Sequence, residues 1–203
     1  MICNDEGMAR LETPLLIAIA SCSALHAGLC SRASEAPRHD FQFFAGFSPS
    51  STVVSHAAPN RRLVVAGFSY SYHCWVWSSV SLNYTATAMP AAIVIQPDSH
   101  AVYGFGVTPL GFTFEPTCRR RLSPFLDTME GMIASTEPIP ENQTNATGLN
   151  FLFGAGGGLR WNFAPRRALT LGYRFLHISN ANTTSYNPSL NSHVIYAGYS
   201  LSR

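Results

Sequence analysis

Charged residues are scarce in this sequence. Asp, Glu, Lys and Arg together make up 12% of its 203 residues, and the formal net charge is +2. Disordered chains are richer in charge and poorer in hydrophobic residues than this one, which is 46% hydrophobic. A nucleic-acid-binding surface needs a basic excess that the chain lacks. The composition therefore favours one folded domain and argues against nucleic acid as a partner.

Long hydrophobic runs are missing after residue 30. A helical membrane protein needs stretches of about 20 consecutive apolar residues, so the body of the chain does not fit that architecture. The mean hydropathy of +0.07 is ordinary for a soluble protein. A transmembrane β-barrel has an equally modest average, because lipid-facing and lumen-facing residues alternate along each strand.

Residues 1–36 are expected to form a signal peptide, which leaves residues 37–203 as the mature barrel domain. An apolar core covers residues 14–30, and a small residue stands two positions before a cleavage point after Ala33. Cleavage at a lipoprotein box ending in Cys22 is the alternative. A retained anchor helix is disfavoured because the apolar run is short.

Cysteine offers little chemistry. Three of the five cysteines lie in the leader, and only Cys74 and Cys118 remain in the body of the chain. Their spacing matches no metal site. An exported pair either forms a disulfide or stays as two thiols, so the sequence predicts no metal centre.

The body of the chain alternates between bulky apolar residues and small or polar ones. In Leu149–Phe163, Phe151, Phe153 and Trp161 fall on one side, and glycines with Arg160 fall on the other. A bulky side facing lipid and a small, polar side facing a cramped lumen are typical of a narrow barrel. Eight strands are expected: Asp40–Phe47, Arg62–Tyr72, Cys74–Ala86, Ala101–Phe114, Arg121–Ala134, Leu149–Phe163, Ala168–Ser179 and His193–Leu201. The predicted fold is all-β, a small closed antiparallel transmembrane β-barrel of eight strands.

The connections between these segments indicate an orientation. Long polar gaps are Ser48–Arg61, Thr87–His100, Ser135–Gly148 and Asn180–Ser192, and short ones lie around His73, at Glu115–Arg120 and at Ala164–Arg167. Such barrels have short periplasmic turns and longer outside loops. If the first strand runs outward, every long gap lies outside the cell and every short one lies in the periplasm.

A histidine and a serine interrupt the apolar face of the seventh segment. Leu169, Leu171 and Tyr173 point to the same side as His177 and Ser179, because successive strand residues alternate. An apolar face normally excludes such polar groups. Their placement has a structural explanation if the histidine is an interfacial residue at the barrel rim and the serine caps a loop. The functional one is a base beside a nucleophile, at the outer end of a strand.

The run His177–Asn182, HISNAN, followed by an Asn-Pro turn and a closing YAGYS strand, resembles the lipid A 3-O-deacylase (PagL-type acyloxyacyl hydrolase) family. The resemblance implies an outer-membrane barrel esterase that removes an ester-linked acyl chain from lipopolysaccharide without a cofactor or metal. It implies Ser179 as nucleophile, His177 as base and Asn180 as the residue that stabilises the oxyanion. Lipid A and outer-membrane lipid are then the expected partners, and a homodimer stays open.

The third member of the implied triad departs from the family. The family has a glutamate on the last strand, where this chain has Asn191. An amide can orient His177 by a hydrogen bond but supplies no charge. The alternatives are an acid elsewhere, Asp127 or Glu130, or a reduced or absent activity.

Two other functions fit the pattern. One is a non-catalytic small outer-membrane barrel of the OmpW or OmpA type, with a binding or structural role. The other is a soluble lipocalin-like carrier, in which the apolar side would face inward. Arg61 and Arg62, at the outer rim, are expected to be well placed for lipid A phosphates. The chain ends in Ser202-Arg203, whereas barrels of this kind usually end on an aromatic residue.

Overall fold

The structure is a computed structural model that describes residues 39–52, 58–98, 100–118, 120–141 and 143–203. The expected signal peptide lies outside the described residues. Eight antiparallel strands follow one another along the chain: β1 (His39–Ser48), β2 (Arg62–Trp77), β3 (Val80–Ile95), β4 (Ala101–Pro116), β5 (Leu122–Ile139), β6 (Thr147–Ala164), β7 (Arg167–Ser179) and β8 (Ser189–Ser202).

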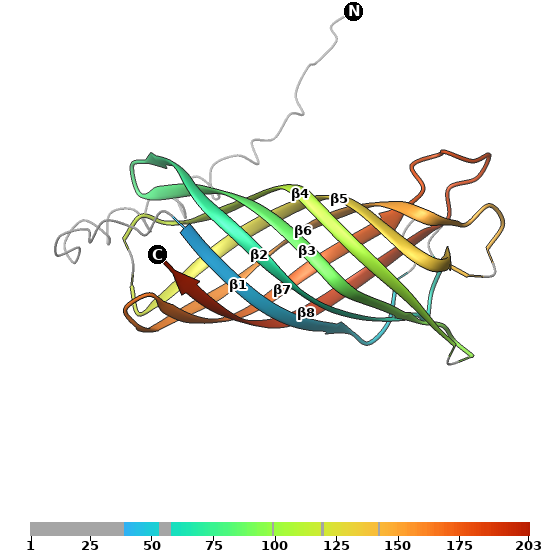
Figure 1. Cartoon of the computed structure of the whole chain (residues 1–203), viewed down its shortest axis with the longest axis horizontal. Helices are drawn as coiled ribbons and strands as arrows, with labels where there is room; N and C mark the ends of the chain where they lie inside the picture. Colours follow the sequence, from blue (N-terminus) through green and yellow to red (C-terminus); the bar gives the residue numbers. More distant parts are fainter. Residues whose placement is uncertain (1–38, 53–57, 99, 119, 142) are drawn as a thin grey trace, which may run out of the picture. The chain divides into compact units, whose positions relative to one another are not determined.

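The strands form a closed barrel in which each pairs with its sequence neighbours and β1 pairs with β8 (Figure 1). The seam holds at its end, where the N–H of His39 donates to the carbonyl of Arg203 at 3.2 Å and the N–H of Arg203 donates back at 2.8 Å. Closure leaves no unpaired edge, as a membrane-spanning sheet requires. The predicted eight-stranded antiparallel barrel is confirmed.

In the described part of the chain, no helix has the length and apolarity that a membrane crossing requires.

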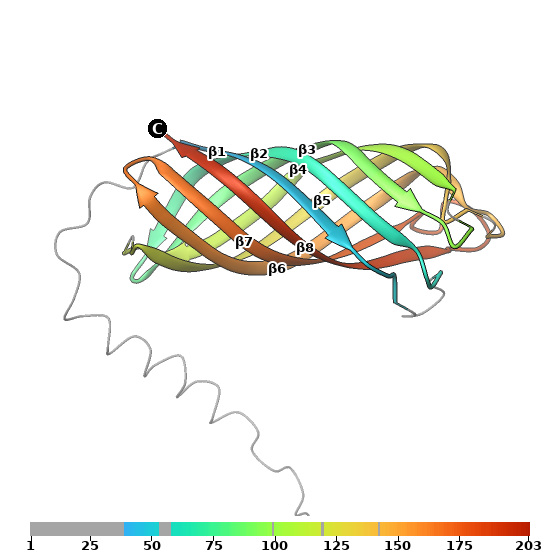
Figure 2. The same cartoon turned by 90° about the horizontal axis from the view of Figure 1, so that it is seen from below.

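The connections sort to two ends of the barrel (Figure 2). One end, called here the outer end, carries residues 49–61, 96–100, 140–146 and 180–188, and the other carries the turns at 78–79, 117–121 and 165–166. Three of the four outer connections are longer than every inner one, as expected, but the loop at 96–100 is much shorter than predicted and no longer than the inner connection at 117–121.

The predicted turn at His73 is wrong, because β2 continues to Trp77. His73 pairs across the sheet with Asn83, and the Nδ1 atom of His73 lies 2.9 Å from the Oδ1 atom of Asn83. The chain reverses instead at Ser78, which has φ of 52°. β3 likewise continues past Ala86 to Ile95, where small residues and Pro90 suggest a loop. Pro90 falls at a register irregularity between Met89 and Ala92, where a missing N–H is tolerated.

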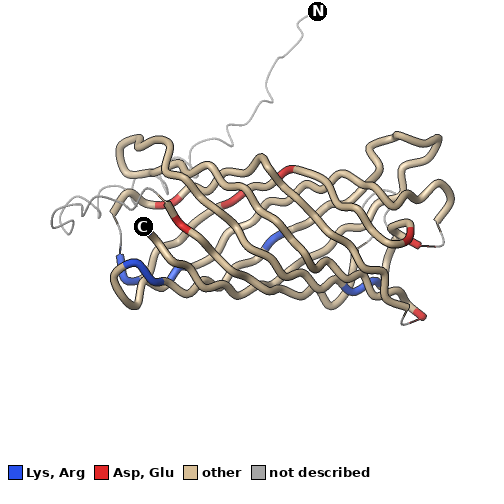
Figure 3. Tube along the Cα trace, viewed as in Figure 1, with Lys and Arg blue, Asp and Glu red and all other residues tan. Residues whose placement is uncertain are grey.

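The outer wall is apolar, as predicted. Exposed large apolar side chains occur on all eight strands, with Leu126, Leu171 and Ile195 each more than 60% exposed. Figure 3 shows that few positions along the strands of the barrel are charged. A soluble carrier would hide these side chains from water, so the lipocalin-like alternative is disfavoured.

The inner half of the lumen is polar and the outer half is largely apolar, which differs from the expectation of a polar interior throughout. In the inner half, Arg174 donates to Asp127 Oδ2 at 2.7 Å, and Arg160 pairs with Asp40 at 3.2 Å. The outer half is filled by buried apolar side chains: Leu63, Val94, Val102, Ile133, Leu152, Leu176, Ile178, Leu190 and Val194. Apolar packing fills a narrow barrel without leaving polar groups to be satisfied. The polar half retains a cavity of about 20 Å³, which suffices for roughly one water.

Candidate active site

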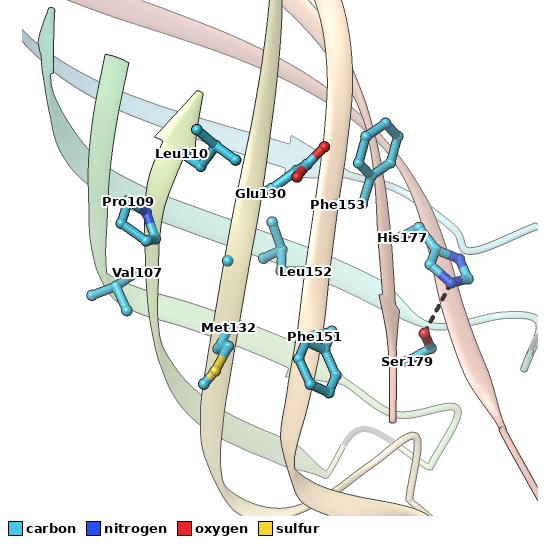
Figure 4. A pocket seen from close by; sticks show the side chains of 11 residues that line it. Val107, Pro109, Leu110, Glu130, Met132, Phe151, Leu152, Phe153, His177 and Ser179 are labelled. Atoms are coloured by element: carbon cyan, nitrogen blue, oxygen red, sulfur yellow. Dashed lines mark hydrogen bonds between the residues drawn. The ribbon is translucent and has the colours of Figure 1, made fainter. Parts of the chain in front are cut away.

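His177 and Ser179 lie at the outer end of β7 with their side chains in contact. The Nε2 atom of His177 is 3.0 Å from Ser179 Oγ (Figure 4). The alternation along β7 explains this arrangement, because residues two apart share a face. The strand ends at Ser179, so the pair lies at the rim rather than midway down the wall.

Asn191 holds the other side of the His177 ring. Its Oδ1 is 2.6 Å from His177 Nδ1. The two residues are direct partners in the β7–β8 ladder, because β8 begins at Ser189, four residues earlier than predicted. Cross-strand partners of an antiparallel pair bring their side chains together on one face.

The hydrogen bond from His177 Nδ1 to Asn191 Oδ1 fixes the tautomer of His177. An amide oxygen only accepts hydrogen bonds, so Nδ1 carries the proton and donates it to Asn191. Nε2 is then unprotonated and accepts the hydroxyl proton of Ser179. Asn191, His177 and Ser179 therefore form a relay in which the nitrogen facing the serine is able to act as a base.

Burial favours this relay. Ser179 and Asn191 are 5% and 2% exposed, and His177 is half-buried. Behind them, Ile178 and Leu190 belong to the apolar filling of the outer lumen. Hydrogen bonds are stronger in such a dry setting than in water.

The structure does not bring the alternative acids to His177. Asp127 points into the lumen, where its Oδ2 accepts hydrogen bonds from Arg174 at 3.0 and 2.7 Å. Glu130 lies on the outer wall, but Phe153 stands between it and His177 in the cross-strand row. Of the three candidates, Asn191 alone contacts the imidazole.

Asn180 is committed to the loop that follows β7. It is fully buried, and its amide group donates to the Asn145 carbonyl at 3.1 Å, to Thr184 Oγ1 at 2.8 Å and to the Tyr186 carbonyl at 3.0 Å. Its Oδ1 accepts the N–H of Asn182 at 3.0 Å. These contacts show that the amide of Asn180 organises the loop, and the oxyanion role that the resemblance implies for it stays a prediction.

The turn after Asn180 offers backbone donors instead. Ala181 and Asn182 have φ of 51° and 59°, in the left-handed region. Successive N–H groups in such a turn can converge on an anion. Within the described residues, the N–H of Ala181 donates to no protein acceptor.

An apolar groove of about 570 Å³ runs along the outer wall from Ser179 across β6 and β5 to β4. Its lining consists of Val107, Pro109, Leu110, Glu130, Gly131, Met132, Phe151, Leu152, Phe153, His177 and Ser179 (Figure 4). The groove is not predictable from the sequence, because it combines four strands whose pairing register the sequence does not reveal.

A bulge on β4 forms the far wall of the groove. The β4–β5 register shifts between Val107 and Leu110, so Pro109 and Leu110 both point outward. A bulge also tolerates the missing N–H of Pro109. Gly131 lies beneath it, where a Cβ would stand 2.0 Å from the Val107 carbonyl oxygen. The close approach of the two strands therefore requires glycine at position 131. In the sequence, the only sign of it is a single Gly within a predicted strand.

The rim arginines are not equivalent. Arg61 is 7% exposed and donates to Gln96 Oε1 at 2.8 Å, the Pro59 carbonyl at 2.9 Å and the Glu141 carbonyl at 3.1 Å. Burial lowers the pKa of its guanidinium, and the nearby Glu141 carboxylate opposes this. Arg61 therefore joins loops together, and only Arg62 is exposed for the phosphate contact that the sequence suggested for both.

One cluster in the described part of the chain could hold a metal ion: His100, Glu137 and Glu141 at the outer rim. His100 Nε2 lies 3.1 Å from Glu137 Oε1 in an exposed ion pair. The hydrogen bond to Glu137 raises the pKa of His100 above its ordinary 6.5. None of these residues lines the groove. Cys74 is a free, exposed thiol, so a Cys74–Cys118 disulfide does not form.

Comparison with known proteins finds one matching family model. The family model described as lipid A 3-O-deacylase (PagL) matches residues 64–200. No curated protein sequence matches the chain.

Solved structures share the fold. The outer membrane enzyme PagL has a TM-score of 0.63 at 18% identity, over 80% of this chain and 99% of that one. Neisserial surface protein A has a TM-score of 0.53 at 13% identity, over 84% of this chain and 100% of that one. At these identities the likeness concerns the fold alone.

Proposed function

Because the chain belongs to the lipid A 3-O-deacylase (PagL) family, we propose that it is an outer-membrane esterase that hydrolyses the 3-O-linked acyl chain of lipid A. The observation that carries the proposal is the Asn191–His177–Ser179 relay on the lipid-facing wall, at the end of an apolar groove. The family match supports lipid A as substrate class. The roles of individual residues rest on the geometry.

The first half of the reaction acylates Ser179. Its Oγ attacks the ester carbonyl while His177 Nε2 takes the hydroxyl proton. The carbonyl oxygen becomes an oxyanion, for which backbone N–H groups of the turn at Ala181 are the proposed donors. His177 then gives its proton to the leaving sugar oxygen as the ester bond breaks, and the acyl chain remains on Ser179.

The second half releases the fatty acid. A water gives its proton to His177 Nε2 and attacks the acyl carbon, and the bond to Ser179 breaks as His177 returns the proton to Oγ. Asn191 keeps Nδ1 protonated throughout, which prevents the ring from turning its wrong nitrogen to the serine. It supplies no negative charge to the imidazolium that forms in each half.

The position of the relay suits a lipid of the outer leaflet. His177 and Ser179 lie at the outer end of a strand whose lipid-facing side carries Leu169 and Leu171. An ester just below the headgroup can reach the site from the side, without extraction from the membrane. The acyl chain then lies in the groove against Phe151 and Phe153.

A non-catalytic barrel is the second candidate, and the neutral Asn191 in place of an acid favours it. The two are separated by incubating the purified, detergent-solubilised protein with lipopolysaccharide and recording mass spectra of the lipid A. We expect loss of one ester-linked acyl chain and appearance of the free fatty acid. Unchanged lipid A would assign the protein to the non-catalytic class.

A further inference from the structure

Glu130 is a carboxyl group on the lipid-facing wall. It lies on β5, exposed on the same face as Leu126 and Met132, and among the described residues no hydrogen bond or ion pair involves it. Ionisable groups facing lipid are costly and indicate function by default. Glu130 takes no part in the His177 relay, because Phe153 separates the two.

Glu130 lies partway along the groove that begins at Ser179. The cross-strand row runs from Leu110 through Glu130 and Phe153 to His177. Strands are about 4.8 Å apart, so Glu130 is roughly 10 Å from His177 and one strand spacing from the β4 wall. An acyl chain attached at Ser179 therefore meets Glu130 along its length, well beyond the ester.

The row also descends into the membrane. His177 lies two residues from the outer end of β7 at Ser179, whereas Glu130 lies nine residues from the outer end of β5 at Ile139. Hydrogen-bonded rows slope in a barrel because the strands are tilted. A chain that follows the groove from the rim thus passes Glu130 at greater depth.

We propose that Glu130 determines acyl-chain length, so that the groove selects chains that end before its carboxyl group over longer, unsubstituted chains. This inference rests on the proposed function. Of the side chains that line the groove beyond His177 and Ser179, Glu130 alone is polar. A short chain contacts only Phe151 and Phe153. A longer chain places methylene groups against Glu130. These groups remove water from the carboxyl group without offering it a hydrogen bond, which costs free energy.

The test compares two lipid A analogues that differ in one ester, hexanoyl or hexadecanoyl, presented in detergent micelles. The measured quantity is the ratio of kcat/KM for the long ester to that for the short one. Glu130→Leu should raise this ratio about tenfold, the scale of discrimination by an apolar pocket. Glu130→Gln, which keeps the shape but removes the charge, should raise it less. Glu137→Gln removes a carboxyl group from the same strand outside the groove and should leave the ratio unchanged.

A binding measurement separates this inference from the proposed function. In the Ser179→Ala background, the ratio of Kd values for the two uncleaved analogues should shift in the same direction when Glu130→Leu is added. An unchanged ratio in both turnover and binding would overturn the role of Glu130. A shifted binding ratio in a protein that cleaves neither ester would overturn the proposed function and leave the selectivity of the groove standing.

Discussion

At the scale of single residues, the amide of Asn191 decides which nitrogen of His177 faces the serine. A carbonyl oxygen 2.6 Å from Nδ1 leaves Nε2 free to accept the proton of Ser179. The neutral amide can therefore orient the imidazole as an acid would. It cannot add the negative charge that would stabilise an imidazolium. The relay depends on each of its three members in a different way.

Replacing Ser179 or His177 by Ala should abolish release of a 3-hydroxy fatty acid, because each change removes a group that takes part in the proposed reaction. The expected loss in kcat is about 10⁴-fold or more. Both residues lie at a strand end, where truncation costs little packing, so the barrel should still fold. Fatty-acid release is measured by mass spectrometry, with heat-modifiable gel mobility as the folding control. Wild-type turnover in Ser179→Ala would show that another group is the nucleophile.

Asn191→Glu should preserve the hydrogen bond to His177 and add a negative charge beside the imidazolium of the transition state. The deacylation rate is expected to rise about tenfold or to shift its pH optimum, since close charges act strongly in a dry site. Asn191→Ala should lower the rate sharply because the ring loses its orienting partner. Rate profiles over pH for the three forms measure this. Identical profiles would make Asn191 a bystander.

At the scale of elements, the sequence predicted best where alternation was strict. β6 and β7 alternate regularly up to an irregularity between Asn162 and Ala164, so their faces and the shared side of His177 and Ser179 could be predicted from the sequence. Asn180 was assigned a catalytic role by its motif, although its amide binds a loop whose path the sequence does not show. The end of β3 was missed because Pro90 sits in a bulge, and the groove because it needs the register of four strands.

The short loop at 96–100 is tied to β5 by the pair of His100 and Glu137. The raised pKa of His100 means that its protonated form stabilises this contact. The contribution is complete below pH 6.5, the ordinary value, and is lost as the pH rises through the raised pKa. An NMR titration of His100 should give a midpoint above 6.5 that falls in Glu137→Gln. A midpoint that does not respond to Glu137→Gln would contradict the pair.

At the scale of the whole molecule, the barrel is a closed wall with a filled interior. Apolar side chains occupy the outer half of the lumen, and ion pairs hold the inner half together. Among the residues that the structure describes, the cavity in the polar half has room for roughly one water. The groove beside His177 and Ser179 lies on the outside of this wall.

The protein is expected to fractionate with outer membranes and to show β-rich circular dichroism with heat-modifiable gel mobility. The reason is the apolar wall around the closed strand ladder. Membrane fractionation followed by gels of boiled and unboiled samples measures both properties. Recovery from the soluble periplasm without detergent would contradict an apolar wall that faces lipid.

Because the groove opens sideways, the substrate concentration that matters for this protein is the concentration within the membrane surface. A ligand that arrives from the surrounding leaflet meets the site by lateral diffusion, so the encounter is two-dimensional. The quantity that sets the encounter rate is the mole fraction of lipid A in the surface, not its amount per volume of solution. Diluting the substrate with inert detergent should slow the reaction even when the bulk amount is constant, and crowding within the leaflet should speed it.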